Sequence, residues 1–455
     1  MSDLEKAFNT LSAKLTAYDQ LFKYAEGNQK LIYTAERLEE AFNKLHARFN
    51  QNWCEVVIGS VLDRLVLKGF DPANKTINDK LDALWERYGL GLDAYDLHRD
   101  ALITGEGYII AWREGDVTDV YRNDPRLCHL FYKADRPKIK DFAAKWFSSS
   151  DGHTHIVLYY EDRLEYYVCE KKNKPDNARA FVQEREPAEN PFRVIPVFRF
   201  TSPGELNNII TLQDAINKLM ADMMVAAEYG AFKQRWVVSN ADTEQLKNGP
   251  NLVWSLPAGD GSGQQTQVGE FSSTELKNYI DAIDDLANKA AVISRTPKHY
   301  LAAAGASISG DALLAMEAPL IKKVQQRQER FSATWQELAA FLLKLEGEDV
   351  DKTTLLPVWA PAQSDQPITD AQSIQYQVQA GIPLETVLRR KGWSKTEIAQ
   401  MRSDMDEQKK RDTEMSKALL DKLRAEADAA NAAGSTDPAA TDPNNPADGA
   451  SNGQQ

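Results

Sequence analysis

The stretch of the chain best suited to chemistry is SRTPKHYLAAAGASISGDALLAMEAP, residues 294–319. It starts with two cations, Arg295 and Lys298, and with His299, and it then continues into Ala, Gly and Ser. Cationic side chains beside a run of small residues are suited to contacting anions such as phosphate groups. The chemistry expected of this stretch is therefore anion binding, and the type of anion has to come from its surroundings.

A nucleotide-binding loop is the first interpretation of these residues. Gly305 and Gly310 have the G-x-x-x-x-G spacing of a phosphate loop. The next residues are Asp311 and Ala312, where such a loop needs Lys and then Ser or Thr. Because no lysine follows and Asp311 would repel phosphate, the pattern argues against a nucleotide site. A plain connection between two helices, with incidental charges, is the other interpretation.

Catalytic and metal-binding patterns are weak in the rest of the sequence. The motifs H-E-x-x-H, G-x-S-x-G, G-x-G-x-x-G and the EF-hand loop do not occur. His153 and His155 alternate on a predicted strand, but no third ligand type stands out near them. Asp281, Asp284 and Asp285 place carboxylates close together on a predicted helix. Such a group could act in acid–base catalysis, but a solvent-exposed helix face is the favoured interpretation. We therefore expect no catalytic residue, no metal and no cofactor.

A basic run, KKVQQRQER at residues 322–330, places Lys323, Arg327 and Arg330 on one side of a predicted helix. A solvated face is the simplest interpretation of this run. The alternatives are an ion-pairing seam with a neighbouring subunit and a stripe that faces DNA.

The composition is that of a soluble globular protein with two or three domains. The chain has 455 residues, 42% hydrophobic and 27% charged, with a net charge of −13. Such a charge argues against a broad basic surface that coats nucleic acid, but it permits local basic sites. Three scattered cysteines, Cys54, Cys128 and Cys169, indicate reduced thiols without a zinc site. The sequence has no signal-peptide pattern at its start and no apolar run long enough for a membrane span, so we expect a cytoplasmic protein.

The first half of the chain has an α+β pattern. Residues 1–50 are predicted to be amphipathic helix, and residues 52–70 a buried helix capped by Asn52. Residues 93–114 change from a helical to a strand pattern near Gly105, and several short strands of a mixed sheet follow up to residue 200.

The second half is mainly helical. Long helices are predicted over 208–232 and 272–293, with three short strand-like runs between them, so the pair can form an antiparallel stalk with a small β insert at its far end. The strongest pattern is a stripe of apolar residues from 310 to 346, with Pro319 inside it, which predicts one kinked helix. Two short helices broken near residues 381–383 and a charged segment at 402–429 follow.

The last segment, residues 430–455, has no aromatic residue and no aliphatic residue larger than Ala. It cannot bury enough surface to offset its ordering entropy, so disorder is predicted. Ending the chain at Asn431 is therefore expected to leave folding and assembly intact. Differential scanning calorimetry checks this, because a fall of more than a few degrees in melting temperature would show that the tail packs on the body.

The order of these parts resembles the portal proteins of tailed double-stranded DNA bacteriophages, in particular those of phages of Gram-positive hosts. The resemblance covers roughly residues 30–400 and rests on the order of elements together with four stretches: NWCEVVIGSVLDRL, HRDALITGEGYIIAW, LMADMMVAAEYGAFKQRWV and TPKHYLAAAGASISGDALLAMEAPLIKKVQQRQERF. It implies an α+β, mainly helical, portal-type subunit. The implied domains are a wing (1–207), a first stem helix (208–232), a clip (233–271), a second stem helix (272–293), a tunnel loop (294–309), a long kinked helix (310–346), the wing return and start of the crown (347–401), a charged helical crown segment (402–429) and a disordered tail (430–455).

The resemblance also implies a function and partners. Portal subunits form a ring of about twelve copies at one capsid vertex, through which double-stranded DNA is packaged and ejected without regard to its sequence. The implied partners are the terminase large subunit, the major capsid and scaffolding proteins and a head-completion or adaptor protein, in the virion and, during assembly, in host cytoplasm. Mapped onto this chain, the tunnel-loop candidates are Arg295, Lys298, His299, Ser307 and Ser309, and the clip-interface candidates are Trp236, Val238, Val253, Trp254 and Val268.

Two other classes of function stay open at this stage. One is a cytosolic helical scaffold or adaptor that never meets DNA, and the other is an unrecognised enzyme that uses the sheet domain at 94–200. A channel explains the first stretch physically, because a mobile loop with few cations touches DNA thinly, whereas strong phosphate contacts along the whole wall would hold it.

Overall fold

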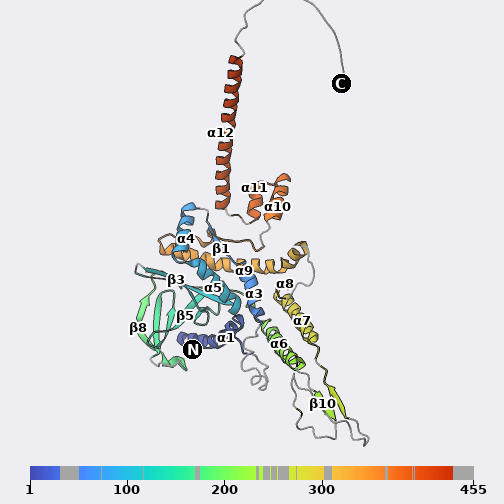
Figure 1. Cartoon of the computed structure of the whole chain (residues 1–455). Helices are drawn as coiled ribbons and strands as arrows, with labels where there is room; N and C mark the ends of the chain where they lie inside the picture. Colours follow the sequence, from blue (N-terminus) through green and yellow to red (C-terminus); the bar gives the residue numbers. More distant parts are fainter. Residues whose placement is uncertain are drawn as a thin grey trace, which may run out of the picture. The chain divides into compact units, whose positions relative to one another are not determined.

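The computed structural model describes residues 1–30, 51–169, 175–231, 235–238, 266–301 and 310–433, with the single residues 246 and 254 and without positions 73, 116, 273, 364–366, 392 and 394. The chain divides into two compact units, Met1–Ser373 and Ile374–Gln455. The fold is α+β and mainly helical, as predicted (Figure 1).

The chain opens with helices and one short strand: α1 (Asp3–Ala25), α3 (Trp53–Leu62), β1 (Leu67–Asp71), α4 (Lys75–Arg87) and α5 (Leu90–Thr104). The predicted cap is confirmed, since the Asn52 side chain accepts a hydrogen bond from the main chain of Glu55 at the start of α3. The predicted extent of that helix is wrong, because it ends at Leu62 and strand β1 follows. β1 pairs with β12 (Leu356–Trp359), a partner from the far end of the unit that no local pattern reveals.

The strands that follow α5 form two antiparallel sheets. The three-stranded sheet has the order β3-β2-β9, and the five-stranded sheet has the order β4-β5-β6-β7-β8. Their strands are β2 (Glu106–Glu114), β3 (Val117–Asn123), β4 (Cys128–Tyr132), β5 (Lys140–Ser148), β6 (Thr154–Tyr159), β7 (Arg163–Cys169), β8 (Val182–Glu189) and β9 (Val197–Thr201), with a short 3₁₀ turn η2 (Ala178–Ala180) before β8. The predicted change from helix to strand is confirmed at Gly105, whose φ of 92° ends α5.

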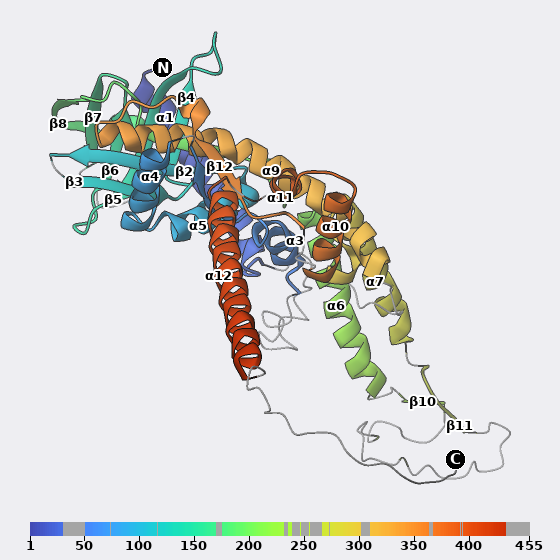
Figure 2. The same ribbon diagram turned by 90° about the horizontal axis from the view of Figure 1, so that it is seen from above.

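A pair of long helices carries a small β ribbon at one end. The elements are α6 (Ile210–Ala231), β10 (Arg235–Val238), β11 (Gln267–Glu270) and α7 (Leu276–Ser294). Figures 1 and 2 show α6 and α7 side by side with the ribbon beyond their far ends. Both predicted helices and the outer two of the three predicted strands are confirmed. The middle run, residues 251–257, lies outside the described residues except for Trp254.

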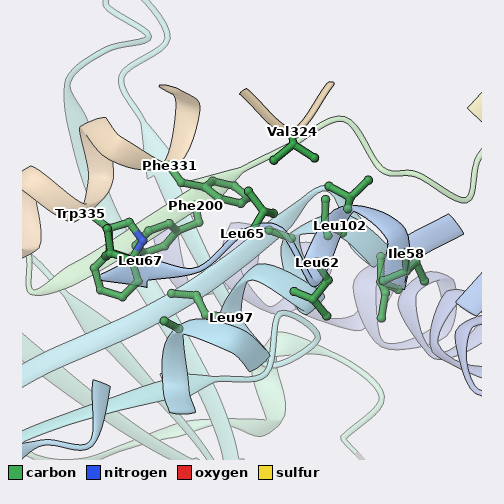
Figure 3. Packing of buried hydrophobic residues seen from close by; sticks show 14 of the residues in the cluster. Ile58, Leu62, Leu65, Leu67, Leu97, Leu102, Phe200, Val324, Phe331 and Trp335 are labelled. Carbon is green, nitrogen blue, oxygen red and sulfur yellow. The ribbon is translucent and has the colours of Figure 1, made fainter. Parts of the chain in front are cut away.

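The helix α9 (Gly310–Leu345) runs through Pro319 and supplies one wall of the main core. Its predicted apolar stripe is confirmed from Leu320 onward, because the stripe residues there are buried. Trp335 and Phe331 of α9 pack on Phe200 of β9, with ring centroids 4.9 Å and 5.9 Å from that of Phe200 (Figure 3). These contacts fix the middle of α9 to the three-stranded sheet, and the apolar stripe of the helix is buried from Leu320 onward. The short elements α8 (Lys298–Leu301) and η3 (Lys352–Thr354) flank it.

The C-terminal part consists of α10 (Pro367–Gln379), α11 (Leu384–Arg390) and α12 (Lys395–Ala433). The predicted break between two short helices is confirmed, with Gly381 at φ 89°. The charged segment predicted at 402–429 belongs to α12, a helix of 39 residues. Disorder is predicted for residues 430–455, but residues 430–433 continue α12, and residues 434–455 lie outside the described residues.

Candidate functional site

The basic segment predicted from the sequence lies directly after α7. Arg295 follows the last residue of that helix in the left-handed conformation, with φ 55° and ψ 30°, which costs an L-residue about 1 kcal/mol. The main-chain N–H of Thr296 donates to the carbonyl of Ala291 at 3.0 Å and closes the helix. Arg295 and Lys298 are exposed, and within the described part of the chain neither has a carboxylate within ion-pair distance. Two cations are therefore available here for a partner.

A buried ion cluster holds the residue just before this segment. The ammonium of Lys323 on α9 donates to the carbonyl oxygen of Ser294 at 2.7 Å and to Glu205 at 2.9 Å. Arg327, one turn further along α9, donates to the other carboxylate oxygen of Glu205 through Nε at 3.2 Å and Nη2 at 2.8 Å. All three charged side chains are less than a tenth exposed. The cluster joins the end of α7 to α9 and to the connection between β9 and α6.

The positions of Lys323 and Arg327 correct the prediction that these two residues belong to an exposed basic face. Lys323 and Arg327 point into the molecule and pair with Glu205 of the same chain, so they form neither a solvated face, nor a stripe for DNA, nor a seam with a neighbour. Only Arg330 of the predicted set is exposed. Burial lowers the pKa of Lys323, Glu205 counteracts this, and Arg327 and Arg295 lower the pKa further.

A second contact group holds the other end of the basic segment. The hydroxyl of Tyr300 accepts from Nη2 of Arg64 at 3.0 Å and donates to Glu317 at 3.1 Å. Arg64 and Glu317 are themselves 3.5 Å apart and largely buried. The segment from Arg295 to Tyr300 is thus anchored at both ends. His299 is partly buried and packs edge-on against the neighbouring Tyr300, with ring centroids 4.7 Å apart.

The remaining tunnel-loop candidates, Ser307 and Ser309, lie outside the described residues.

The carboxylates of α7 lie on its solvent side, as predicted. Asp281, Asp284 and Asp285 are exposed. Lys277 pairs with Asp281 and Lys289 pairs with Asp285, each at 2.7 Å and one helical turn apart. Such exposed pairs add little stability, about 0.3–0.5 kcal/mol each. The exposed face of α7 therefore carries both signs of charge with an acidic excess.

The β10–β11 ribbon exposes apolar side chains. Trp236 lies opposite Gly269 and covers it so closely that a Cβ built on Gly269 would stand 2.4 Å from the indole. Val238 and Val268 are more than half exposed, and Trp236 is 36% exposed. A two-stranded ribbon is marginally stable alone, and among the described residues neither strand has a second partner. Of the other clip candidates, Trp254 lies near Arg235, with 6.0 Å from guanidinium to ring, and Val253 is outside the described residues.

His153, just before β6, and His155 in β6 lie in a polar network that the sequence did not reveal. Nε2 of His155 is 3.0 Å from the hydroxyl of Ser149, and Nδ1 is 3.2 Å from Glu184, an order that resembles a catalytic Ser–His–acid triad. The Ser149 hydroxyl also donates to Asp151, and its main-chain N–H already donates to the carbonyl of His153. Because Asp151 and the His153 carbonyl compete with His155 for the Ser149 hydroxyl proton, and the Ser149 N–H is occupied, the group lacks the arrangement of an activated nucleophile. In the described residues, no group of three or more possible metal ligands occurs here or elsewhere.

None of the described helices is long and apolar enough to cross a membrane.

Comparisons with known proteins agree with the resemblance seen in the sequence. The family model for phage portal proteins of the SPP1 Gp6-like type matches residues 4–414. The portal protein of Mycobacterium phage L5 is 23% identical over 400 residues, which cover 79% of each chain. The portal protein of Mycobacterium phage D29 is 27% identical over 207 residues, or 42% of each chain. Among solved structures, a chain from the neck of a native GTA particle computed with C12 symmetry aligns with a TM-score of 0.43 and 11% identity, over 78% of this chain and 91% of that one.

Proposed function

The chain belongs to the SPP1 Gp6-like family of phage portal proteins, and from this premise we propose that it forms a ring of about twelve copies whose central channel passes double-stranded DNA. As a phage portal protein it is a structural component of the virion. The ring sits at one capsid vertex, is built in host cytoplasm with the major capsid and scaffolding proteins, and docks the terminase large subunit and later a head-completion protein. Its role is to guide DNA rather than to catalyse a reaction.

The parts of the chain take the following roles in this proposal. Residues 1–207 form the wing, α6 and α7 the stem, 233–271 the clip, 294–309 the tunnel loop, 310–346 the long kinked helix, 347–401 the wing return and start of the crown, and 402–429 the charged crown segment. Support for a ring comes from the ribbon and from α7, where Ile280, Val292 and Ile293 are about half or more exposed. Exposed apolar side chains on such a helix pair indicate a surface that neighbouring copies of the chain cover.

The observation that carries the channel proposal is the pair of exposed cations between two anchors. Arg295 and Lys298 have no ion-pair partner among the described residues, whereas the exposed face of α7 before them is acidic by one carboxylate, Asp284, beyond its two lysine–aspartate pairs. An acidic wall repels the phosphate backbone, and one or two cations per subunit give a thin contact ring that does not depend on base sequence. Lysine suits a sliding contact because its ammonium is a point charge on a flexible stem.

Replacing Arg295 and Lys298 together by Ala is expected to leave the ring intact and to change DNA packaging or retention. The change should be larger at low salt, where phosphate contacts are strongest. Mutant rings are assembled into procapsids, and DNase-protected DNA is measured at two salt concentrations. The matched control is Arg136→Ala with Lys138→Ala, which removes the same two residue types from an exposed loop of the wing. Wild-type packaging and retention at both salt concentrations would contradict the proposed DNA contact and show that the segment only connects two helices.

The two alternatives differ from this proposal in particle shape. A scaffold or adaptor protein gives elongated particles, and an enzyme built on the sheet domain gives compact monomers. Electron micrographs of the purified protein separate all three, since only the portal proposal requires rings with a central hole.

A further inference from the structure

Lys323 lies where three separate segments of the chain meet. Its ammonium binds the carboxylate of Glu205, which belongs to the connection between β9 and α6, and the carbonyl of Ser294 at the end of α7. The main chain of Glu205 is fixed in turn, because its N–H donates to the carbonyl of Leu102 in α5 at 2.8 Å. Lys323 therefore connects the last residue before Arg295 to the core of the unit.

We propose that Lys323 is the positioning residue for the cations Arg295 and Lys298, which it holds at a fixed place by binding the end of α7. This inference rests on the proposed function, in which these two cations touch DNA. Lys323 itself, at 4% exposure, touches no ligand.

The cluster contains two cations and one carboxylate, so Lys323 does more than neutralise Glu205. Arg327 alone neutralises Glu205 with two hydrogen bonds, so Lys323 adds a second, uncompensated positive charge to a buried site. Burying a charge in excess of its partner is unfavourable, and burial indeed lowers the pKa of this lysine. The contact that only Lys323 makes is the one to the Ser294 carbonyl, where the C-terminal end of the α7 dipole favours a cation. Its distinct contribution is thus the attachment of α7.

Positioning matters at this point because the chain changes direction there. Ser294 is the last residue of α7, and Arg295 is held in a left-handed conformation that is unfavourable without support. The N–H groups of Thr296 and Arg295 already bind the carbonyls of Ala291 and Val292, whereas the carbonyl of Ser294 is bound by Lys323. Losing this last contact favours fraying at the end of the helix. A frayed end would let Arg295 and Lys298 lie at different distances from the channel axis in different subunits. The ring of contacts with DNA would then be uneven.

The first test measures position without DNA. Lys298→Cys is labelled with a nitroxide in the full-length protein, since Cys54, Cys128 and Cys169 are buried. Adding Lys323→Met replaces the lysine by an unbranched, uncharged side chain one atom shorter and leaves Glu205 paired with Arg327. The rotational correlation time of the label is expected to fall by about twofold or more, because the end of α7 becomes mobile on the nanosecond scale. Lys322→Met, the same change on the exposed neighbouring lysine, should leave the spectrum unchanged. Equal spectra for Lys323→Met and Lys322→Met would overturn the inference.

The second test asks whether position acts through the two cations. Lys323→Met alone should shift DNA retention in the same direction as the Arg295→Ala, Lys298→Ala pair, with melting temperature within a few degrees of wild type. In the triple variant Lys323→Met should add nothing, because no cations are left to position. Additive effects would mean that Lys323 acts on the ring in another way, and the inference would fail. A mobile label together with normal retention in the Arg295→Ala, Lys298→Ala pair would instead contradict the proposed DNA contact and leave the positioning role standing.

Discussion

Replacing residues 236–269 by the two residues Asn-Gly is expected to abolish ring formation and to leave a folded monomer. Arg235 and Glu270 are opposite each other in the β10–β11 ladder, so a two-residue turn joins them without strain on α6 or α7. The variant removes the ribbon with its exposed Trp236, Val238 and Val268, whose open edges we expect to pair with neighbouring subunits. The main core between α5, β9 and α9 does not involve the ribbon and should stay intact.

Light scattering coupled to size exclusion gives the particle mass for this experiment, and circular dichroism reports whether the monomer is folded. The comparison variant has Asn-Gly in place of residues 239–266, which keeps the ladder up to the Val238–Gln267 pair. For this comparison variant, a larger fraction of the protein should have the mass of the ring than for the complete replacement. Rings of unchanged mass after the complete replacement would contradict the assignment of the ribbon to the subunit interface.

The second large effect is expected at Glu205. Glu205→Leu leaves Lys323 and Arg327 buried without a counter-charge, and breaking a buried ion pair in this way costs about 3–5 kcal/mol of unfolding free energy. Replacing the whole group, with Glu205→Leu, Lys323→Met and Arg327→Met together, should recover most of this loss, because no charge is then buried. The difference in unfolding free energy between the single and the triple variant therefore shows that the three charges depend on one another.

Guanidinium unfolding of the variants measures these differences. The control is Arg330→Met, an exposed arginine on the same helix, for which a change below about 0.5 kcal/mol is expected. A Glu205→Leu variant that loses less than about 1 kcal/mol would show that water or a rearranged partner compensates Lys323 and Arg327.

Elements with a strong local signal were predictable from the sequence. The apolar stripe of α9 and the helix pair α6 and α7 follow from periodicity, and the end of α5 follows from Gly105. The overlong prediction for α3 has a tertiary cause. The apolar residues after Leu62 fit a helix as well as a strand, and the pairing of β1 with the distant β12 decides for the strand.

The candidate site was only half predictable. Arg295 and Lys298 stand out because two cations precede a long run of small residues. The burial of Arg327 had a signal that was available, since this arginine occupies a position of the apolar stripe of α9. Its partner Glu205 lies 122 residues away in a connection without periodicity, so the ion cluster and the contact of Lys323 with Ser294 required the fold. The same holds for the Arg64–Tyr300–Glu317 group, which joins α9 to the turn after α3.

The most direct test of the whole account is an electron cryomicroscopy reconstruction of the purified full-length protein. The account predicts closed rings of about twelve copies with a central hole, with Arg295 and Lys298 on the inner wall, Lys323 bound to the end of α7 and the β10–β11 ribbon paired with that of a neighbouring copy. Monomers alone, or rings in which Arg295 and Lys298 face outward, would contradict it.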